Sequence, residues 1–551
     1  MLISFSLSNF KGFQKLEPID LKPLTVICGA NNSGKSSIIQ SLLLMKQSTI
    51  GNRTASFDVG IQEPLILDGE ESAFVHLGDW ADVIYRHETD NKMSFKWQLQ
   101  LKSLVKSLDA EINVDIENIN SQNQAGKKLR VSRFQFKELN TPFSFELIKD
   151  KHEKYRLKLT ATSLKVLLHY WVYETLPVGW NKWFKKLTQD FIHDDIQFNN
   201  ISVEFNGVFP KSVQGNFAEQ SYHVLDNHLN RKKFNPNDEN KNQEYIKFIK
   251  DMLVNLSNYI NKGKSSGKTH LFKPNKKVEL SIINNYQLAT QYMRKFFLNF
   301  RYLGPVREVP RRHYFINKIG QSTIGSKGEY TSIILAEKQE ELIPPYYRCI
   351  YDKKAIKKFE HRSSDKMLEA LNGWLSFMQL PQLIPTPVIE RTISQIKLDS
   401  TGVEVCLPDV GFGVSQILPV LVECLRTKSG ETIILEQPEI HLHPSLQSKL
   451  ADFLICMAKA GKKIIVETHS EHLIKRLYLR SAQEESDAIR NLLNTVFVSF
   501  DERQQTSITK TIVINKYGEI ENWPVGFFDE DDSRELVAAT LKKRMGKVRK
   551  K

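Results

Sequence analysis

A glycine-rich segment near the start of the chain has the residue types and spacing to hold the phosphates of a nucleotide. Residues 29–36 read Gly-Ala-Asn-Asn-Ser-Gly-Lys-Ser, which matches the P-loop pattern G-x-x-x-x-G-K-S. In this pattern backbone N–H groups wrap the phosphates, Lys35 reaches the β- and γ-phosphate oxygens, and the Ser36 hydroxyl ligates Mg²⁺. We therefore expect ATP and Mg²⁺ as cofactors. The residues expected to bind ATP are Gly29, Asn32, Ser33, Gly34, Lys35, Ser36 and Ser37.

Two apolar strands far along the chain end in polar side chains that could complete this site. Residues 431–435 are mostly apolar, and Glu436 follows them directly. A P-loop needs an acid at a second strand end to hold Mg²⁺, so we predict Ser36 and Glu436 as the metal-binding residues. Residues 463–470 repeat the design, and there we expect His469 to sense the γ-phosphate. The alternatives are a surface acidic turn for Glu436 and a structural role for His469.

A second glycine-rich loop suggests a site shared between two copies of the chain. Residues 409–416 read Asp-Val-Gly-Phe-Gly-Val-Ser-Gln and lead into a helical pattern, which is another arrangement for binding an anion at a helix N-terminus. The loop of one protomer would face the P-loop of another across ATP, whereas the alternative is a tight turn that caps the helix. We expect Ser415→Arg to spare folding and to prevent the ATP-bound dimer. The residues expected to act in trans are Gly411, Gly413, Ser415 and Gln416.

These candidate residues need a sheet that brings distant strand ends together. An apolar run at 24–28 leads into the P-loop, and a helical pattern at 37–46 follows it. Beyond residue 360 strands alternate with helices, which argues for a parallel α/β sheet. The expected strands are 402–407, 431–435 and 463–466, and the expected helices are 415–425 and 444–458.

The middle of the chain differs in character and separates the two sets of motifs. It is rich in lysine, asparagine and aromatic residues, with helical spacing of apolar residues within 245–262 and no sustained heptads. We predict an α/β fold: an ATPase head with a P-loop parallel sheet, plus a long, mixed, mainly helical insertion between the two glycine-rich loops. The predicted divisions are 1–90 and 296–530 for the head, 91–295 for an insertion that binds a partner or nucleic acid, and 531–551 for a basic tail.

Composition favours an anionic partner and a reducing compartment. The 551 residues carry a formal net charge of +14, and the pI is near 9.2, which favours nucleic acid as a partner over a merely lysine-rich surface. The five cysteines are scattered without metal-ligand spacing, so we expect reduced thiols and a cytoplasmic location. No apolar run is long enough for a membrane span, and we expect no signal peptide.

Several basic segments are candidates for contacts with phosphates. Residues 542–551 are mostly Lys and Arg and would either grip nucleic acid or form a solvated tail. Residues 231–234 combine cations with a ring that could stack on a base, and an exposed loop is the alternative. Arg307, Arg311 and Arg312 flank a proline-containing turn, where they would bind an anion, a neighbouring subunit or nearby carboxylates.

Together these motifs resemble the ABC/SMC/OLD superfamily of P-loop ATPases. Residues 9–13, Asn-Phe-Lys-Gly-Phe, are similar to the strand and loop that open SMC-, RecF- and OLD-like heads. The loop around Ser415 resembles the signature motif, and residues 436–439 resemble the Walker B strand end. Residues 441–444 are similar to the D-loop, and His469 resembles the switch histidine. The resemblance implies a homodimeric head that sandwiches two ATP molecules.

Three further segments resemble the PtuA family, the ATPase subunits of Septu-type bacterial anti-phage systems, including retron-associated ones. They are residues 302–307, 413–419 and 522–528. This resemblance implies a separate HNH-type nuclease as partner and, in the retron version, a reverse transcriptase with RNA-linked single-stranded DNA. The ATPase would hold the nuclease in check until infection disturbs the complex.

The acid strand departs from the superfamily pattern at one position. In most ABC-type heads a catalytic glutamate follows the metal-binding acid directly, and here that position is Gln437. An amide is neutral and a poor general base, so either Glu439 takes over or hydrolysis is slow and ATP mainly holds the dimer together. We expect slow hydrolysis, with Glu439, Gln437 and His469 as the candidate catalytic residues.

Other functions stay open on the sequence alone. An OLD-like ATPase would carry its own Toprim nuclease, but only about eighty residues follow His469, and the acidic cluster 529–532 lacks a convincing second unit around it. An SMC- or RecF-like ATPase of DNA repair or chromosome maintenance would bind DNA directly. An ABC transporter subunit is disfavoured by the long insertion.

Overall fold

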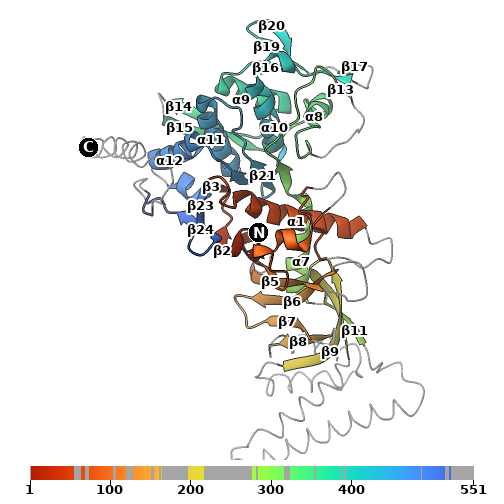
Figure 1. Cartoon of the computed structure of the whole chain (residues 1–551). Helices are drawn as coiled ribbons and strands as arrows, with labels where there is room; N and C mark the ends of the chain where they lie inside the picture. Colours follow the sequence, from red (N-terminus) through yellow and green to blue (C-terminus); the bar gives the residue numbers. More distant parts are fainter. Residues whose placement is uncertain are drawn as a thin grey trace, which may run out of the picture. The chain divides into compact units, whose positions relative to one another are not determined.

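The chain forms two compact units in the computed structural model (Figure 1). The head unit comprises Met1–Thr49, Leu67–Asn91 and Arg294–Lys551, and the insertion unit comprises Ile50–Ile66 and Lys92–Met293. The structure describes residues 2–54, 64–68, 74–102, 107–119, 128–150, 154–160, 163, 196–215, 276–280, 283–315, 323–352, 355–385, 388–389, 393–484, 487–515 and 520–522.

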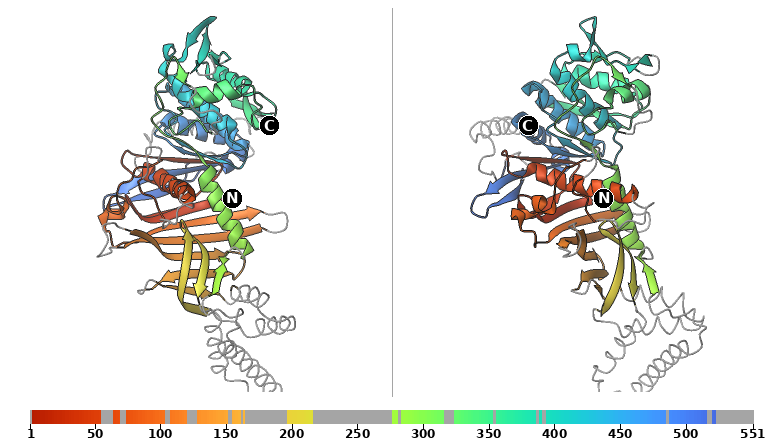
Figure 2. Two further views of the ribbon diagram at one scale, coloured as in Figure 1. Left: turned by 90° about the vertical axis from the view of Figure 1, so that its right-hand side faces the viewer. Right: turned by 45° about the vertical axis from the view of Figure 1, so that its right-hand side comes forward.

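The nucleotide motifs lie along a six-stranded sheet of the head unit, drawn in Figures 1 and 2. Its strand order is β12-β21-β22-β3-β23-β24. Neighbours from β12 to β23 are parallel, and β24 pairs antiparallel with β23. The carboxyl ends of β21, β22 and β3 therefore meet at one edge of the sheet. The bounds are β12 Arg301–Leu303, β21 Thr432–Glu436, β22 Lys463–Glu467, β3 Leu24–Gly29, β23 Leu493–Asp501 and β24 Thr506–Ile512.

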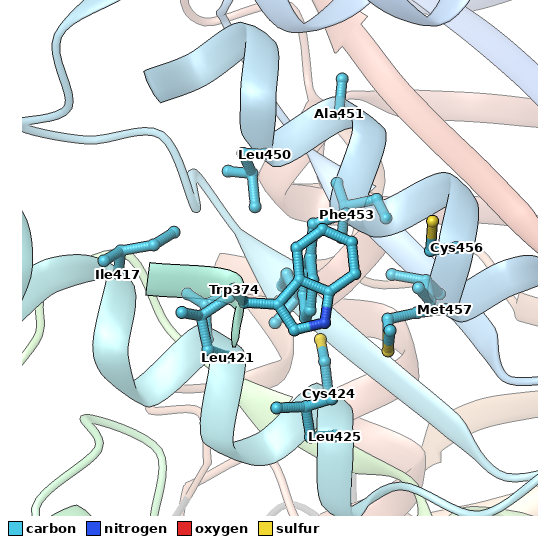
Figure 3. Close-up of a cluster of buried hydrophobic side chains, with 14 of the residues drawn as sticks. Trp374, Ile417, Leu421, Cys424, Leu425, Leu450, Ala451, Phe453, Cys456 and Met457 are labelled. Atoms are coloured by element: carbon cyan, nitrogen blue, oxygen red, sulfur yellow. The ribbon is translucent and has the colours of Figure 1, made fainter. Parts of the chain in front are cut away.

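Helices cover both faces of this sheet, which explains why the inner strands β21, β22 and β3 are almost fully buried. Alternate strand residues such as Val26, Leu435 and Val466 join one buried cluster with α9, α10 and α11. Figure 3 shows Trp374 of α9 inside this cluster, where its ring meets Phe453 edge-to-face at a centroid distance of 4.9 Å. Figure 1 shows α1 on the other side of the sheet. The bounds are α1 Lys35–Thr54, α9 Met367–Met378, α10 Phe412–Arg426 and α11 Pro444–Lys459.

The strands and helices predicted next to the motifs are confirmed, with one exception in their arrangement. The strand expected at 402–407 is β20, and it lies outside the parallel sheet, in a small antiparallel sheet of order β16-β19-β20. Thr401 and Gly402 have positive φ angles of 56° and 85°, so the chain turns back tightly and pairs β20 with β19 as a hairpin. Period-two alternation alone did not reveal which sheet this strand joins.

The remaining elements of the head unit support this core. β1 and β2 form an antiparallel hairpin at the predicted opening motif, where the Gly12 carbonyl accepts a hydrogen bond from the Ser507 N–H at 2.8 Å. The bounds are β1 Leu2–Phe10, β2 Phe13–Asp20, α2 Trp80–Val83, η2 Tyr85–His87, β13 Tyr314–Phe315, α8 Thr331–Lys338, β14 Tyr346–Asp352, β15 Ala355–Arg362, β16 Gln382–Leu383, β17 Val388–Ile389, β18 Ile393–Ser394, β19 Lys397–Ser400, β20 Val403–Cys406, η5 Leu407–Asp409, α12 Glu471–Gln483 and α13 Ala488–Leu492.

Strands predominate among the described residues of the insertion unit. β4 to β11 follow one another as antiparallel neighbours, and Tyr286 at the start of α7 packs against Phe134, Phe136 and Phe145. These strands, such as β5, alternate apolar and polar residues, as expected of strands with one buried face. The helical pattern at 245–262 lies outside the described residues. The bounds are β4 Met93–Lys102, β5 Ser107–Ile119, β6 Lys128–Glu138, β7 Ser144–Lys149, β8 Tyr155–Leu159, β9 Ile196–Asn206, β10 Phe209–Gly215, β11 Lys276–Glu279 and α7 Asn284–Asn299.

Cysteine and hydropathy patterns can also be compared with the structure. The five cysteines are free thiols, as their scattered positions predict, although the sulfur atoms of Cys349 and Cys456 lie 3.0 Å apart. Within the part of the chain that the structure describes, no helix combines the length and apolar character needed to cross a membrane.

Candidate nucleotide-binding site

The P-loop connects β3 to α1, and its geometry requires glycine at both conserved positions of the pattern. Gly29 and Gly34 have φ angles of 146° and 102°, which side chains rarely tolerate. A Cβ on Gly29 would lie 2.0 Å from the carbonyl oxygen of Val498, and one on Gly34 would lie 2.7 Å from the Ser507 hydroxyl oxygen. The loop therefore passes β23 and β24 too closely for a side chain, and this contact explains the glycine spacing.

Two polar side chains of the P-loop, those of Ser33 and Lys35, are buried, whereas Asn31, Asn32 and Ser36 are exposed. The Lys35 ammonium donates a hydrogen bond to the Ala30 carbonyl at 2.5 Å, so it closes the loop on itself. Burial lowers the pKa of Lys35, and the nearby Glu467 carboxylate opposes that shift. The Ser33 hydroxyl is buried without a hydrogen-bond partner, which marks it as a group that a ligand could satisfy. Ser36 donates its hydroxyl proton to Glu467 Oε1 at 3.0 Å.

Two glutamates face the P-loop from neighbouring strand ends. Glu436 ends β21, Glu467 ends β22, and the two are register partners across the parallel pair. The Tyr302 hydroxyl, from the edge strand β12, donates to Glu436 Oε1 at 3.2 Å. Burial, and then the Glu467 charge, raise the pKa of Glu436 to about 7. The structure thus brings predicted Glu436 and Ser36 to one edge and adds Glu467 between them.

The three predicted catalytic residues lie at the same edge. Gln437 follows Glu436 with a φ of 43°, and its N–H donates to the Glu467 carbonyl at 2.8 Å. Glu439 is buried, and its Oε1 accepts a hydrogen bond from the His469 backbone N–H at 2.9 Å. The His469 ring is exposed, and desolvation together with the Lys35 charge lowers its pKa. Glu439 is therefore already engaged by one of its two oxygens.

Arg307 donates hydrogen bonds to the backbone of the turn that follows β21, which resembles the Walker B strand end. Its guanidinium donates to the carbonyl oxygens of Gln437 at 2.9 Å and of Glu436 at 3.2 Å. It is only 5% exposed, and burial lowers its pKa to about 10. The two neighbouring arginines that we considered together with it form exposed ion pairs instead: Arg311 with Glu308, and Arg312 with Asp409.

The second glycine-rich loop is built differently from the P-loop. Gly411 is the N-cap of α10, and no side chain caps this helix, so its first N–H groups are available to an anion. Gly411 and Phe412 are exposed, but Ser415 and Gln416 are buried, and the Ser415 hydroxyl donates to the Phe412 carbonyl at 2.7 Å. An arginine at position 415 would have to displace this packing, so Gly411, which is exposed, is the better position for testing the loop.

The predicted D-loop packs against this second loop. The His441 ring meets the Phe412 ring edge-to-face with centroids 5.0 Å apart, and a Cβ on Gly413 would lie 3.5 Å from the His441 carbonyl oxygen. Among the described residues, no hydrogen bond or ion pair links residues 409–416 to residues 29–37 of the same chain. Within the described residues of one protomer, the two loops are therefore not bonded to each other.

The residues at the P-loop edge fit a nucleotide with Mg²⁺. Besides Ser33, buried oxygens of Glu439 and Glu467 have no hydrogen-bond partner. Within the described residues, no group of three or more His, Cys, Asp and Glu side chains could hold a metal ion. Mg²⁺ commonly uses only one or two carboxylates together with phosphate oxygens, and Ser36 and Glu436 match that requirement.

Sequence reasoning did not assign three contributing residues to this site. Tyr302 and Arg307 come from the edge strand and its following turn, and no motif spacing connects them with Glu436. Glu467 had a usable signal, since it follows an apolar strand directly, as Glu436 does. The segments 231–234, 523–528, 529–532 and 542–551, to which we assigned partner, family or nucleic-acid contacts, lie outside the described residues.

Comparison with known proteins gives one family match across most of the chain. Residues 1–474 match the AAA ATPase domain family (AAA_15), and residues 494–535 match a family of unknown function, DUF3696. No curated protein matches the chain significantly.

Solved SMC heads are weakly similar in structure. The SMC head domain from Thermotoga maritima has 8% identity and a TM-score of 0.33, covering 93% of this chain and 99% of that one. An SMC head bound to the C-terminal winged-helix domain of ScpA has 9% identity and a TM-score of 0.32, covering 94% and 98%. A head with an extended coiled coil, bound to a ScpA domain derived from Pyrococcus furiosus, has 9% identity and a TM-score of 0.29, covering 93% and 96%. TM-scores this low support no further conclusion.

Proposed function

Because this chain belongs to the AAA ATPase domain family, we propose that it is a slow ATPase whose ATP-bound homodimer restrains a separate HNH-type nuclease in an anti-phage complex. Nucleotide binding follows from the family and from the P-loop geometry. The dimer, the slow turnover and the nuclease are the steps that the proposal adds.

The P-loop edge would bind and orient the triphosphate. When ATP binds, Lys35 would leave the Ala30 carbonyl and bind the phosphates, because a charged phosphate oxygen is a stronger acceptor for an ammonium than a backbone carbonyl. Ser36 and Glu436 would hold Mg²⁺, which supplies positive charge against the β- and γ-phosphate oxygens when bound. His469, exposed beside this edge, would contact the γ-phosphate.

The proposal of slow hydrolysis is supported mainly by the turn that follows β21, where no free carboxylate follows Glu436 directly. The position after Glu436 is Gln437, whose backbone is held by Arg307 and by the Glu467 carbonyl. Glu439 is the next carboxylate along the chain, and one of its oxygens accepts a hydrogen bond from the His469 N–H. Gln437 has no carboxylate, and Glu439 is buried with one of its oxygens bound to the His469 N–H, so proton abstraction would be inefficient and ATP would persist.

If bound ATP persists, it would keep two protomers joined and would not drive repeated cycles of movement. The uncapped N-terminus of α10, with exposed Gly411 and Phe412, would bind the γ-phosphate held by the partner protomer. Closing two such sites would join the protomers for as long as ATP remains.

The nuclease partner rests on the resemblance of residues 302–307, 413–419 and 522–528 to the PtuA family. A reverse transcriptase with RNA-linked single-stranded DNA would join in a retron version, and the net charge of +14 suits a nucleic-acid partner. We place the complex in the cytoplasm. The alternatives are an SMC- or RecF-like DNA-repair ATPase and an OLD-like ATPase with its own nuclease.

The proposal is tested by purifying the chain together with an HNH-type nuclease encoded beside it. DNA cleavage is measured with ATP present and after ATP has been removed by apyrase. We expect a stable complex that is inactive with ATP and cleaves DNA after ATP removal, and constitutive cleavage when the ATPase carries Lys35→Ala. DNA cleavage by the chain alone, or no association with the nuclease, would contradict it.

A further inference from the structure

Glu467 lies between the two elements that would hold the metal, and no family motif assigns it a role. It ends β22, which lies between β3 and β21 in the sheet. Its Oε1 accepts the Ser36 hydroxyl proton at 3.0 Å. Its Oε2 is buried and has no hydrogen-bond partner, and the whole residue is 1% exposed.

The chemistry of a serine ligand explains the first contact. A hydroxyl has one proton to donate and two lone pairs. When its oxygen binds a cation, the proton must point to an acceptor on the other side. Glu467 Oε1 is such an acceptor. The hydrogen bond fixes the rotation of the hydroxyl, so a lone pair of the Ser36 oxygen stays free to bind the cation.

The second carboxylate oxygen of Glu467, Oε2, lies among several buried charges. Three buried carboxyl groups, from Glu436, Glu439 and Glu467, lie at this edge with the cations Lys35 and Arg307. A buried carboxylate oxygen without a partner is costly, and a metal-bound water would satisfy it. Groups behind the direct ligands commonly tune metal affinity in this way.

We propose that Glu467 is a positioning residue for Mg²⁺: Oε1 orients the Ser36 hydroxyl, and Oε2 accepts a hydrogen bond from a water bound to the metal. The inference rests on the nucleotide site alone and is independent of the nuclease partner.

The test measures binding of a fluorescent, non-hydrolysable ATP analogue to the full chain during a Mg²⁺ titration and in EDTA. For Glu467→Gln we expect the Mg²⁺ concentration at half-maximal binding to rise about tenfold or more, with affinity in EDTA unchanged. Glu467→Asp keeps the charge but is shorter, so it should fall between parent and Glu467→Gln. Glu471→Gln is the matched control, because Glu471 pairs with Lys475 on the surface of α12.

A double substitution separates positioning from general stability. If Glu467 acts through Ser36, adding Glu467→Gln to Ser36→Ala should raise the half-maximal Mg²⁺ concentration by much less than it does in the parent. If Glu467→Gln does not fold, Glu467→Asp gives the same comparison. A Mg²⁺ titration of Glu467→Gln equal to that of the parent overturns the inference and leaves the ATPase intact. If binding of the ATP analogue to the parent does not depend on Mg²⁺, the metal site is overturned as well.

Discussion

The two glycine-rich loops of the head unit each lead into a helix, but their surroundings are opposite. At the P-loop, a Cβ on Gly29 would lie 2.0 Å from a backbone oxygen, while at the second loop a Cβ on Gly411 would meet nothing within 4 Å. The P-loop has positive φ angles at both pattern glycines, whereas Gly411 has an ordinary φ of −48°. The fold of the protomer therefore demands glycine in the first loop and not at Gly411. A requirement for glycine at position 411 must come from something outside the protomer.

Alanine substitutions test this contrast with the largest expected effect. Gly29→Ala forces a Cβ against the Val498 carbonyl at a φ that disfavours side chains, so we expect a loss of more than about 3 kcal/mol of stability. Gly411→Ala should change stability by less than about 0.5 kcal/mol. Thermal unfolding of both variants measures this difference in stability. Equal losses of stability would contradict the proposed difference between the two loops.

The buried carboxyl edge beside the P-loop should depend on pH. The folded pKa of Glu436 is about 7, above its ordinary value of 4.5. Its stabilising contribution is therefore fully present below pH 4.5 and is lost as pH rises through about 7. Glu436→Gln keeps a neutral group, so nucleotide-free Glu436→Gln should exceed the parent by up to about 3 kcal/mol above pH 7 and match it near pH 4. Unfolding at several pH values measures this gain, and a gain independent of pH would refute the assignment.

Lys35→Ala tests whether the P-loop binds the phosphates of ATP. The ammonium donates a hydrogen bond to the Ala30 carbonyl, and the cost of its burial opposes its attraction to Glu467, so its loss should leave the melting temperature nearly unchanged. ATP affinity should fall by about a hundredfold, because a charged contact to the phosphates is lost. Calorimetric titration with ATP checks this, and unchanged affinity would show that the loop does not bind the phosphates.

Gly411→Arg tests the second loop from outside. The side chain has room in the protomer, so the variant should fold, yet ATP-dependent dimerisation should weaken at least tenfold. Sedimentation with ATP and EDTA measures the dimer, and Val403→Arg is the control, since Val403 is 60% exposed on β20. Normal dimerisation of Gly411→Arg would remove this loop from the interface.

The sequence predicts the parts of the site that follow one another along the chain. The P-loop, its flanking strand and helix, and the acidic end of β21 are readable because each is a local pattern with a known function. The parallel sheet follows from the alternation of those patterns. The same reasoning led to the correct edge for Ser36, Glu436 and His469.

The contacts missed by sequence reasoning depend on packing between distant segments. Tyr302 and Arg307 reach the Walker B turn only because β12 pairs with β21. The burial of Ser415 depends on how α10 lies against its neighbours, and the hairpin partner of β20 depends on two residues with positive φ. None of these features has a period or spacing of its own.

In the proposed function, ATP is held and hydrolysed slowly because Gln437 occupies the position of the general base. The most direct measurement is the steady-state ATP turnover of the purified chain beside Gln437→Glu and Glu439→Gln. We predict parent turnover below about 0.1 s⁻¹, under the usual enzyme range, and at least a tenfold increase for Gln437→Glu, because a positioned base contributes at least that much. Brisk parent turnover that Glu439→Gln abolishes would contradict the account and make Glu439 the working base.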